Sequence, residues 1–222
     1  MTKAFDIETI PNKALIPMLP EPEVALGNTK DPEKIKEKIA EAKQKQIDRM
    51  ALSPLYGRIC SMSFFGDAPE SRLYYTIPEI SDAAEIELIN LIFAGLCVGN
   101  EETNKIVTWN GTAFDFPYLY KRAAILRVAK PPACPGLRYW TKRYEAITHC
   151  DLMQELSGWN QADNIKLDVA ARMFLGKQKT ERDYSTYIDL IEKGERDKIG
   201  IDNLCDTELT YELYQLLAPY LF

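Results

Sequence analysis

Residues 3–8 read Lys-Ala-Phe-Asp-Ile-Glu, and this stretch decides how the rest of the chain is interpreted. Apolar Phe5 and Ile7 alternate with acidic Asp6 and Glu8, which predicts a short strand with both carboxylates on one face. Two carboxylates about 4 Å apart on an inner strand repel each other by roughly 4 kcal/mol at an effective dielectric constant of about 20. A divalent cation would remove that repulsion, so the pair is a candidate metal site.

A second acidic motif, Asn-Gly-Thr-Ala-Phe-Asp at 110–115, lies between a predicted strand over 105–109 and a predicted helix over 116–127. Asp115 stands at the start of this helix, where the helix dipole favours an anion. Taken alone, Asp115 is therefore better explained as a helix cap than as a metal ligand.

The third acidic feature lies in the last predicted helix, residues 199–218. One face of this helix, at spacings i, i+4, i+7, i+11 and i+14, carries Asp202, Asp206, Leu209, Leu213 and Leu216. Acids that continue an apolar face suggest that the face runs from the core into a polar cleft. The alternative is an acid pair at the surface, where the helix begins.

In this order the three features resemble the DnaQ-like, DEDD-type 3′–5′ exonucleases, and in particular the branch related to the proofreading domain of family-B DNA polymerases. The likeness covers most of the chain. Its further parts are Ser53-Pro54 with Arg58-Ile59, His149-Cys150-Asp151-Leu152 and Leu167-Asp168-Val169-Ala170. The resemblance implies an α/β, RNase H-like fold, with a mixed sheet of about five strands flanked by helices.

The resemblance also implies that Asp6, Glu8, Asp115 and Asp206 bind two Mg²⁺ or Mn²⁺ ions. An all-carboxylate set suits hard divalent ions and suits zinc poorly. The ions would straddle the scissile phosphate, one activating the attacking water and the other stabilising the leaving 3′ oxygen.

The usual aromatic residue before the last acid is missing. The family places a Tyr four residues, or a His five residues, before that acid, and here these positions hold Asp202 and Ile201. Asp202 could accept a proton or hold a water in its place. Alternatively the metal alone suffices, or the site only binds. His149, the single histidine, is expected to be structural.

Substrate contacts are expected from the motifs and from a basic segment. Between Phe116 and Tyr144 there is no acid, and aromatic side chains are interleaved with seven positive charges, as in sites that pair with phosphates and stack on unpaired bases. The alternative is ordinary surface charge with aromatic residues in the core. The residues expected to contact substrate are Thr9, Asn110, Phe114, Lys121, Arg122, Lys142 and Arg143.

Composition bounds the class of protein. The chain has 222 residues, 46% hydrophobic and 27% charged, which is typical of a globular protein. No apolar run spans a membrane, and the N-terminus lacks a signal peptide, so a cytoplasmic location is expected. Five scattered cysteines predict free thiols rather than a disulfide framework. The net charge of −6 argues against nucleic acid on average, although the charge is unevenly spread.

One domain over 1–222 is expected, with a helical insertion at about 11–57. Asp31-Pro32-Glu33 marks the start of a helix that runs to about Met50. Further strands are predicted at 58–66, 72–77 and 148–151, and further helices at 82–97, 151–157, 165–175 and 183–193.

The expected function is metal-dependent removal of nucleoside 5′-monophosphates from a 3′ end. Single-stranded DNA is the favoured substrate and RNA is the alternative, because recognition of the 2′-hydroxyl leaves no short motif here. The sequence shows no polymerase region, so proofreading would serve a replication or repair partner. The rivals are a non-catalytic nucleic-acid-binding module on the same fold and a small-molecule phosphohydrolase that uses the same acids.

Overall fold

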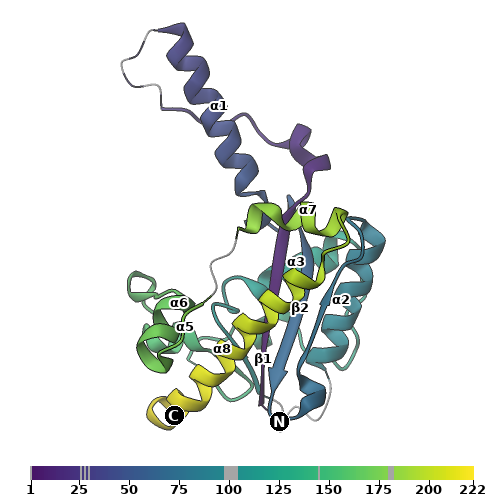
Figure 1. The fold of residues 1–222 in the computed structure, drawn as a ribbon, viewed down its shortest axis with the longest axis vertical. Coiled ribbons are helices and arrows are strands. Elements are labelled where there is room, and N and C mark those ends of the chain that lie inside the picture. The colour runs from purple at the N-terminus through teal and green to yellow at the C-terminus, as the bar shows by residue number, and fades with distance from the viewer. Residues whose placement is uncertain are drawn as a thin grey trace.

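The structure is a computed structural model that describes residues 2–25, 27, 29, 31–97, 105–144, 146–179 and 183–222. A five-stranded sheet forms its centre, in the order β3-β2-β1-β4-β5 (Figure 1). The strands are β1 Thr2–Pro11, β2 Gly57–Gly66, β3 Leu73–Thr76, β4 Lys105–Thr108 and β5 His149–Asp151. The strands expected from the sequence are all present, which confirms the α/β fold with a mixed sheet.

The helices follow the predicted order. They are α1 Pro32–Asp48, α2 Asp82–Leu96, α3 Asp115–Ile125, α4 Leu137–Trp140, α5 Leu152–Leu156, α6 Leu167–Ala170, α7 Tyr187–Glu192 and α8 Asp197–Leu221. Short helical turns are η1 Lys13–Met18, η2 Met50–Leu52, η3 Pro69–Ser71, η4 Gln161–Asp163 and η6 Tyr184–Thr186, and η5 Ala171–Leu175 is a π-helical turn. The helix expected over 165–175 is therefore split into α6 and η5.

Strand β1 is the middle strand and is buried on both faces. It pairs antiparallel with β2 and parallel with β4, and its pairing with β2 shifts register between Glu8 and Thr9. Phe5 and Ile7 belong to the core beneath α2 and α3, whereas Ala4 belongs to the core beneath α8. Asp6 and Glu8 share the face of Ala4, because side chains alternate along a strand. The acids therefore lie on the face that α8 crosses.

Helix α8 lies across the sheet, as Figure 1 shows. Its contact with β2 is partly polar, because Ser63 on the strand hydrogen-bonds with Asn203 and Thr207 on the helix. Leu213 is fully buried, as the predicted face requires, but Leu216 is 41% exposed. The prediction for Leu216 was wrong, because the buried face follows Asn203 and Thr207 and leaves Leu216 at its edge.

The segment between β1 and β2 forms an arm. Asp31 caps α1 by accepting a hydrogen bond from the Glu33 N–H at 3.0 Å, which confirms the predicted helix start. Helix α1 has no buried residue and projects with η1 away from the sheet, at the end of the molecule opposite both termini (Figure 1). Residues 26, 28 and 30 of the expected insertion lie outside the described residues.

One expectation about cysteines is corrected. Cys97, at the end of α2, and Cys134, in the loop before α4, form a disulfide with 5.4 Å between their Cα atoms. Cys60, Cys150 and Cys205 are outside any disulfide, as predicted. No local pattern indicates this pair, because the two residues are 37 positions apart and only the fold brings the loop before α4 against α2, where Cys134 also contacts Phe93.

No helix in the described part of the chain is both long and apolar enough to cross a membrane.

Candidate active site

The acids of the three sequence motifs line a single cleft. Its volume is about 750 Å³, and Asp6, Glu8, Asp115 and Asp206 all contribute to its wall. They come from β1, from the start of α3 and from the middle of α8. The cleft thus brings together residues that the sequence spreads over 200 positions.

A short loop after β4 aims Asp115 into the cleft. The Asp151 carboxylate, at the end of β5, accepts hydrogen bonds from the backbone N–H groups of Asn110 and Thr112, each at 2.9 Å. Asn110 adopts a left-handed backbone with φ of 72°. Gly111 follows it, and a Cβ atom at Gly111 would lie 2.3 Å from the Thr108 side chain. The loop therefore needs a glycine at position 111, and it needs the Asp151 carboxylate as the acceptor for its N–H groups.

Asp115 is the most buried of the acids, at 1% exposure. Its Oδ1 accepts a hydrogen bond from the Ile7 N–H at 3.2 Å. Burial raises the pKa of Asp115 well above its usual value, the Asp6 carboxylate raises it further, and the Ile7 hydrogen bond opposes both. The fold thus holds this carboxylate where its charge is costly unless a cation lies close to it.

Asp206 meets a cation that the chain itself supplies. The Lys179 ammonium lies 2.6 Å from Asp206 Oδ2 and also donates a hydrogen bond to the Tyr184 hydroxyl at 3.2 Å. Burial lowers the pKa of Lys179, but the Asp206 carboxylate outweighs burial and the net pKa is raised. Lys179 and Tyr184 line the same cleft as the acids.

The donor set fits a hard divalent cation. All four acids offer carboxylate oxygens, the ligands that Mg²⁺ and Mn²⁺ prefer, and the buried charge of Asp115 calls for a positive neighbour. Within the described ranges, no three His, Cys, Asp or Glu side chains are grouped closely enough to hold a metal ion. The carboxylates share the cleft without forming a closed coordination shell.

Three of the expected substrate contacts lie in the cleft, namely Thr9, Asn110 and Phe114. The Thr9 hydroxyl donates to the Ala51 carbonyl at 2.8 Å, so toward the cleft it offers lone pairs rather than a proton. The Phe114 ring packs against Tyr118, with 5.4 Å between ring centroids.

The basic residues expected to contact substrate, between Phe116 and Tyr144, do not line the cleft. Lys121, Lys142 and Arg143 are exposed, but none of them lines the cleft. The expectation for Arg122 is wrong, because its guanidinium is 2% exposed and forms two hydrogen bonds with the Glu85 carboxylate, at 2.8 and 2.7 Å. Several interleaved aromatic residues are core residues as well: Phe116, Tyr118 and Trp140.

Asp202, the expected substitute for the missing aromatic residue, does not reach the cleft, and neither does His149. Asp202 lies one turn before Asp206 on α8. It is half-buried and is not part of the cleft wall. His149 is buried in the core, where its Nε2 lies 2.8 Å from the Thr108 hydroxyl. Burial lowers the pKa of His149 to about 4, although Asp151 acts to raise it. This position in the core agrees with the structural role expected for His149.

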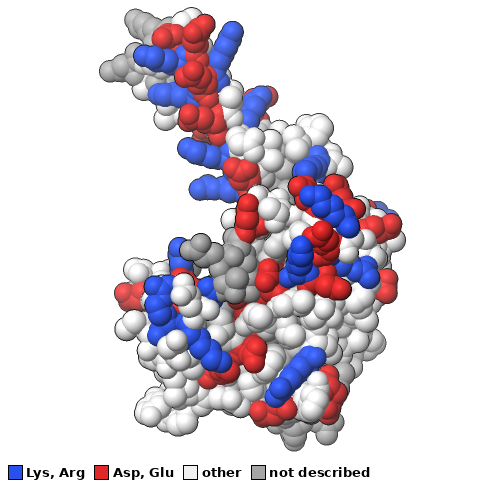
Figure 2. All heavy atoms as spheres, viewed as in Figure 1, with Lys and Arg blue, Asp and Glu red and all other residues white. Residues whose placement is uncertain are grey.

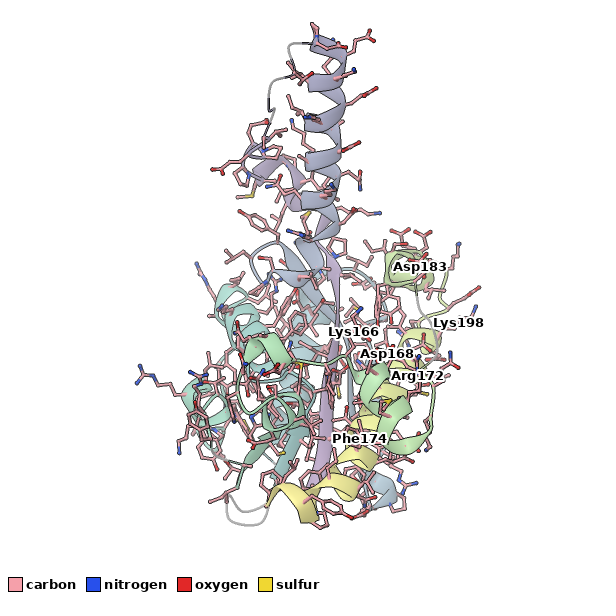
Figure 3. The ribbon with its side chains drawn as sticks, turned by 90° about the vertical axis from the view of Figure 1, so that its left-hand side faces the viewer. Lys166, Asp168, Arg172, Phe174, Asp183 and Lys198 are labelled. Carbon is pink, nitrogen blue, oxygen red and sulfur yellow. A yellow bond between two sulfur atoms is a disulfide. The ribbon has the colours of Figure 1, made fainter. Side chains whose placement is uncertain are left out.

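Sequence reasoning missed one wall of the cleft. Lys166 and Asp168, at the start of α6, line the cleft together with Tyr184 from η6. Figure 3 shows Lys166 and Asp168 near the middle of the molecule, with Asp183, the neighbour of Tyr184, lying apart from them. These residues stand on short elements without periodicity.

The supporting role of Asp151 had a signal in the sequence. It lies at the end of a predicted strand, and the ends of parallel strands β4 and β5 meet at one edge of the sheet.

The charge distribution explains how an acidic chain could approach a polyanion. In Figure 2 basic side chains gather over the region of α5 and α6, and charges of both signs alternate along α1. A cleft with acids at its base and basic residues on its surroundings can bind phosphates once cations occupy it.

Comparisons with known proteins identify a family and a fold for this chain. Residues 51–218 match the model of a family described as predicted 3′–5′ exonuclease related to the exonuclease domain of PolB. Among solved structures, the family B DNA polymerase from the hyperthermophilic archaeon Pyrobaculum calidifontis matches with a TM-score of 0.55 and 16% sequence identity. The match covers 99% of this chain and 24% of that one. No curated protein matches.

At this identity the structural match shows the fold, and it confirms the expected RNase H-like architecture. The family model spans most of the chain and includes two of the four expected metal-binding acids, Asp115 and Asp206. The chain therefore belongs to the family of predicted 3′–5′ exonucleases related to the exonuclease domain of PolB.

Proposed function

We propose that this chain is a metal-dependent 3′–5′ exonuclease that releases nucleoside 5′-monophosphates from single-stranded DNA. The observation that carries the proposal is that Asp6, Glu8, Asp115 and Asp206 line one cleft from three separate elements. A 3′–5′ exonuclease acts on nucleic acid, and enzymes of this kind typically use divalent metals. The proposed substrate is a strand that a replication or repair partner has left unpaired.

The four acids would hold two Mg²⁺ or Mn²⁺ ions. When bound, such ions polarise the phosphate and stabilise charge on the attacking and leaving oxygens. The chain itself orients the strand: Glu8 contacts the terminal 3′-hydroxyl, Asn110 positions the strand, and Phe114 offers a ring face to a base. The hydrogen bond from Ile7 keeps Asp115 directed toward Asp6 as the strand binds.

A time course on single-stranded DNA labelled at its 5′ end tests the proposal. The reactions contain Mg²⁺, Mn²⁺ or EDTA, and compare the parent with Asp6→Ala and with Asp189→Ala, a control at an exposed position of α7. We expect a ladder that shortens from the 3′ end in the parent and the control, and no ladder with EDTA or with Asp6→Ala. An RNA strand of the same sequence decides between the two nucleic acids.

Each rival predicts a different result. A strand that stays intact but still binds would favour a nucleic-acid-binding module. Hydrolysis of a simple thymidine 5′-phosphodiester without any shortening of the strand would favour a small-molecule phosphohydrolase. Cleavage that survives Asp6→Ala would mean that the site lies elsewhere.

Metal binding has a second readout that does not depend on activity. A ligand that binds only the folded state raises the melting temperature. Millimolar Mg²⁺ or Mn²⁺ should therefore raise the Tm of the parent, and Asp6→Asn should reduce that shift.

A further inference from the structure

A tyrosine hydroxyl reaches the cleft from an unexpected segment. Tyr184, on η6, lines the same cleft as Glu8 and Asp206, and it is 47% exposed. Asp202, the residue that the sequence offers for handling the water, is not part of that wall. Tyr184 is therefore the hydroxyl-bearing aromatic residue that the geometry brings to the acids.

Lys179 links this hydroxyl to Asp206. Its ammonium lies 2.6 Å from the Asp206 carboxylate and donates to the Tyr184 oxygen at 3.2 Å. The same ammonium also lies 6.0 Å from the centre of the Tyr184 ring. Two contacts thus separate the tyrosine oxygen from a carboxylate of the proposed metal site, and one side chain holds both.

The turn that carries Tyr184 is fixed by its own hydrogen bonds. The Asp183 carboxylate accepts from the Ser185 N–H at 3.0 Å, and the Thr186 hydroxyl donates to the Asp183 carbonyl at 2.7 Å. The Tyr184 ring also packs edge-on against Tyr187, which is 1% exposed, with 5.4 Å between ring centroids. The hydroxyl is therefore pre-positioned rather than carried on a loose side chain.

The hydroxyl retains the capacity to bind a water molecule. A tyrosine oxygen can both accept and donate hydrogen bonds, and the bond from Lys179 uses only its acceptor capacity. Burial raises the pKa of Tyr184, Lys179 lowers it and Glu8 raises it again, so the net pKa is raised. The group stays protonated at neutral pH and orients a water molecule instead of removing its proton.

We propose that Tyr184, held by Lys179, orients the water that attacks the scissile phosphate. In this step the water oxygen forms a bond to phosphorus and the bond from phosphorus to the 3′ oxygen breaks. The electron pair leaves with the 3′ oxygen, which takes a proton from solvent, and the water gives up its proton to solvent. Tyr184 contacts the reacting water, whereas Lys179 acts through Tyr184 and Asp206. The inference rests on the proposed function.

The test separates turnover from binding. Tyr184→Phe removes only the hydroxyl, and Tyr220→Phe, at a residue 82% exposed near the end of α8, is the matched control. On 5′-labelled single-stranded DNA with Mg²⁺, we expect kcat of Tyr184→Phe to fall by about 10- to 100-fold. Three other quantities should match those of the control. They are the KM, the Tm, and the affinity for the strand, which fluorescence anisotropy measures in EDTA.

Lys179 gives a second, independent readout. Lys179→Met should lower kcat, and Lys179→Arg should recover part of it, because an arginine can still donate to the tyrosine oxygen. Since Lys179→Met removes the ammonium beside Asp206, the Tm shift produced by Mn²⁺ should be at least as large as in the parent. Lys198→Met is the control, because Lys198 is an exposed lysine that pairs with Glu195.

Three outcomes would overturn the proposal. Parental kcat in Tyr184→Phe would exclude an orienting role. A raised KM with weaker strand binding and unchanged kcat would make Tyr184 a substrate contact instead. A parent without metal-dependent cleavage would overturn the proposed function along with this inference, whereas an active parent with a fully active Tyr184→Phe variant would overturn the inference alone.

Discussion

The Oδ1 atom of Asp115 accepts a hydrogen bond from the backbone N–H of Ile7 at 3.2 Å, and this bond joins the start of α3 to the middle of β1 across 108 positions of sequence. Ile7 lies between Asp6 and Glu8, so the bond directs the Asp115 carboxylate toward both neighbours. Since Asp115 is 1% exposed, its charge lacks solvation that water would supply. The geometry that suits a metal site is therefore a source of instability without one.

Asp115→Asn should raise the melting temperature at neutral pH in EDTA. The amide keeps an oxygen for the Ile7 N–H and removes the buried charge. The pKa of Asp115 is raised in the folded state, by burial and then by Asp6, above its unfolded value of about 3.9. Its contribution to stability is therefore complete below about pH 3.9 and is lost as the pH rises through the folded pKa. Each 1 kcal/mol regained should raise the Tm by about 2–4 °C.

Thermal melting from pH 4 to pH 8 checks this expectation. The advantage of Asp115→Asn should shrink toward pH 4, and Mn²⁺ should raise the Tm of the parent more than that of the variant. Asp189→Asn, at an exposed position, should show neither effect. A lower Tm for Asp115→Asn at pH 7 in EDTA would contradict the account.

Gly111→Ala should disturb the loop that presents Asp115. A Cβ at this position would lie 2.3 Å from the Thr108 side chain, so the loop or the strand must shift. We expect a loss of about 1–3 kcal/mol in the free energy of unfolding. Gly136→Ala is the matched control, because a Cβ there meets nothing within 4 Å. Chemical denaturation of both variants measures the difference, and equal stabilities would refute the close approach.

Arg122→Ala should destabilise the protein and not act through nucleic acid. The substitution removes the two-bond partner of the Glu85 carboxylate, which is 0% exposed, and leaves it the more distant Arg58 guanidinium at 3.5 Å and the Ile59 N–H. Breaking a buried ion pair in this way costs about 3–5 kcal/mol. Lys121→Ala, at the exposed neighbour, should change stability by less than about 0.5 kcal/mol. Denaturation curves with equal midpoints for the two variants would contradict a structural role for Arg122.

Local patterns were enough to predict the strands, most of the helices and four of the acids that line the cleft. Alternation along residues 3–8 indicated which side chains share a face, and the cap at Asp31 located the start of α1. The order of Asp6, Asp115 and Asp206 along the chain, compared with a known family, pointed to one site, and their common cleft agrees with it.

The rest depends on contacts that no local pattern records. Arg122 sits in a run of basic residues, and only the position of Glu85 on α2 makes it a core residue. Lys179, in the segment after η5, and Tyr184, on the short turn η6, line the cleft from outside the regular helices, so their spacing carries no periodic signal. The same holds for the pairing of Cys97 with Cys134.

The stability of this protein should fall between pH 6.5 and pH 4 because of His149. Burial lowers the pKa of His149 from 6.5 to about 4 in the folded state, so below pH 6.5 the unfolded chain binds a proton that the folded chain does not. Stability is therefore lost as the pH falls through this window, by at most about 3 kcal/mol. His149 is the single histidine in the sequence, so no other imidazole contributes.

His149→Gln should be less stable at pH 7, since it loses ring packing against Phe116, but its stability should vary less over the window. Guanidinium denaturation of both proteins at pH 7, 6, 5 and 4.5 measures the two slopes, and carboxylates common to both cancel in the difference. Parallel slopes would mean that the imidazole binds its proton at the same pH in the folded and unfolded chain, and would contradict the lowered pKa.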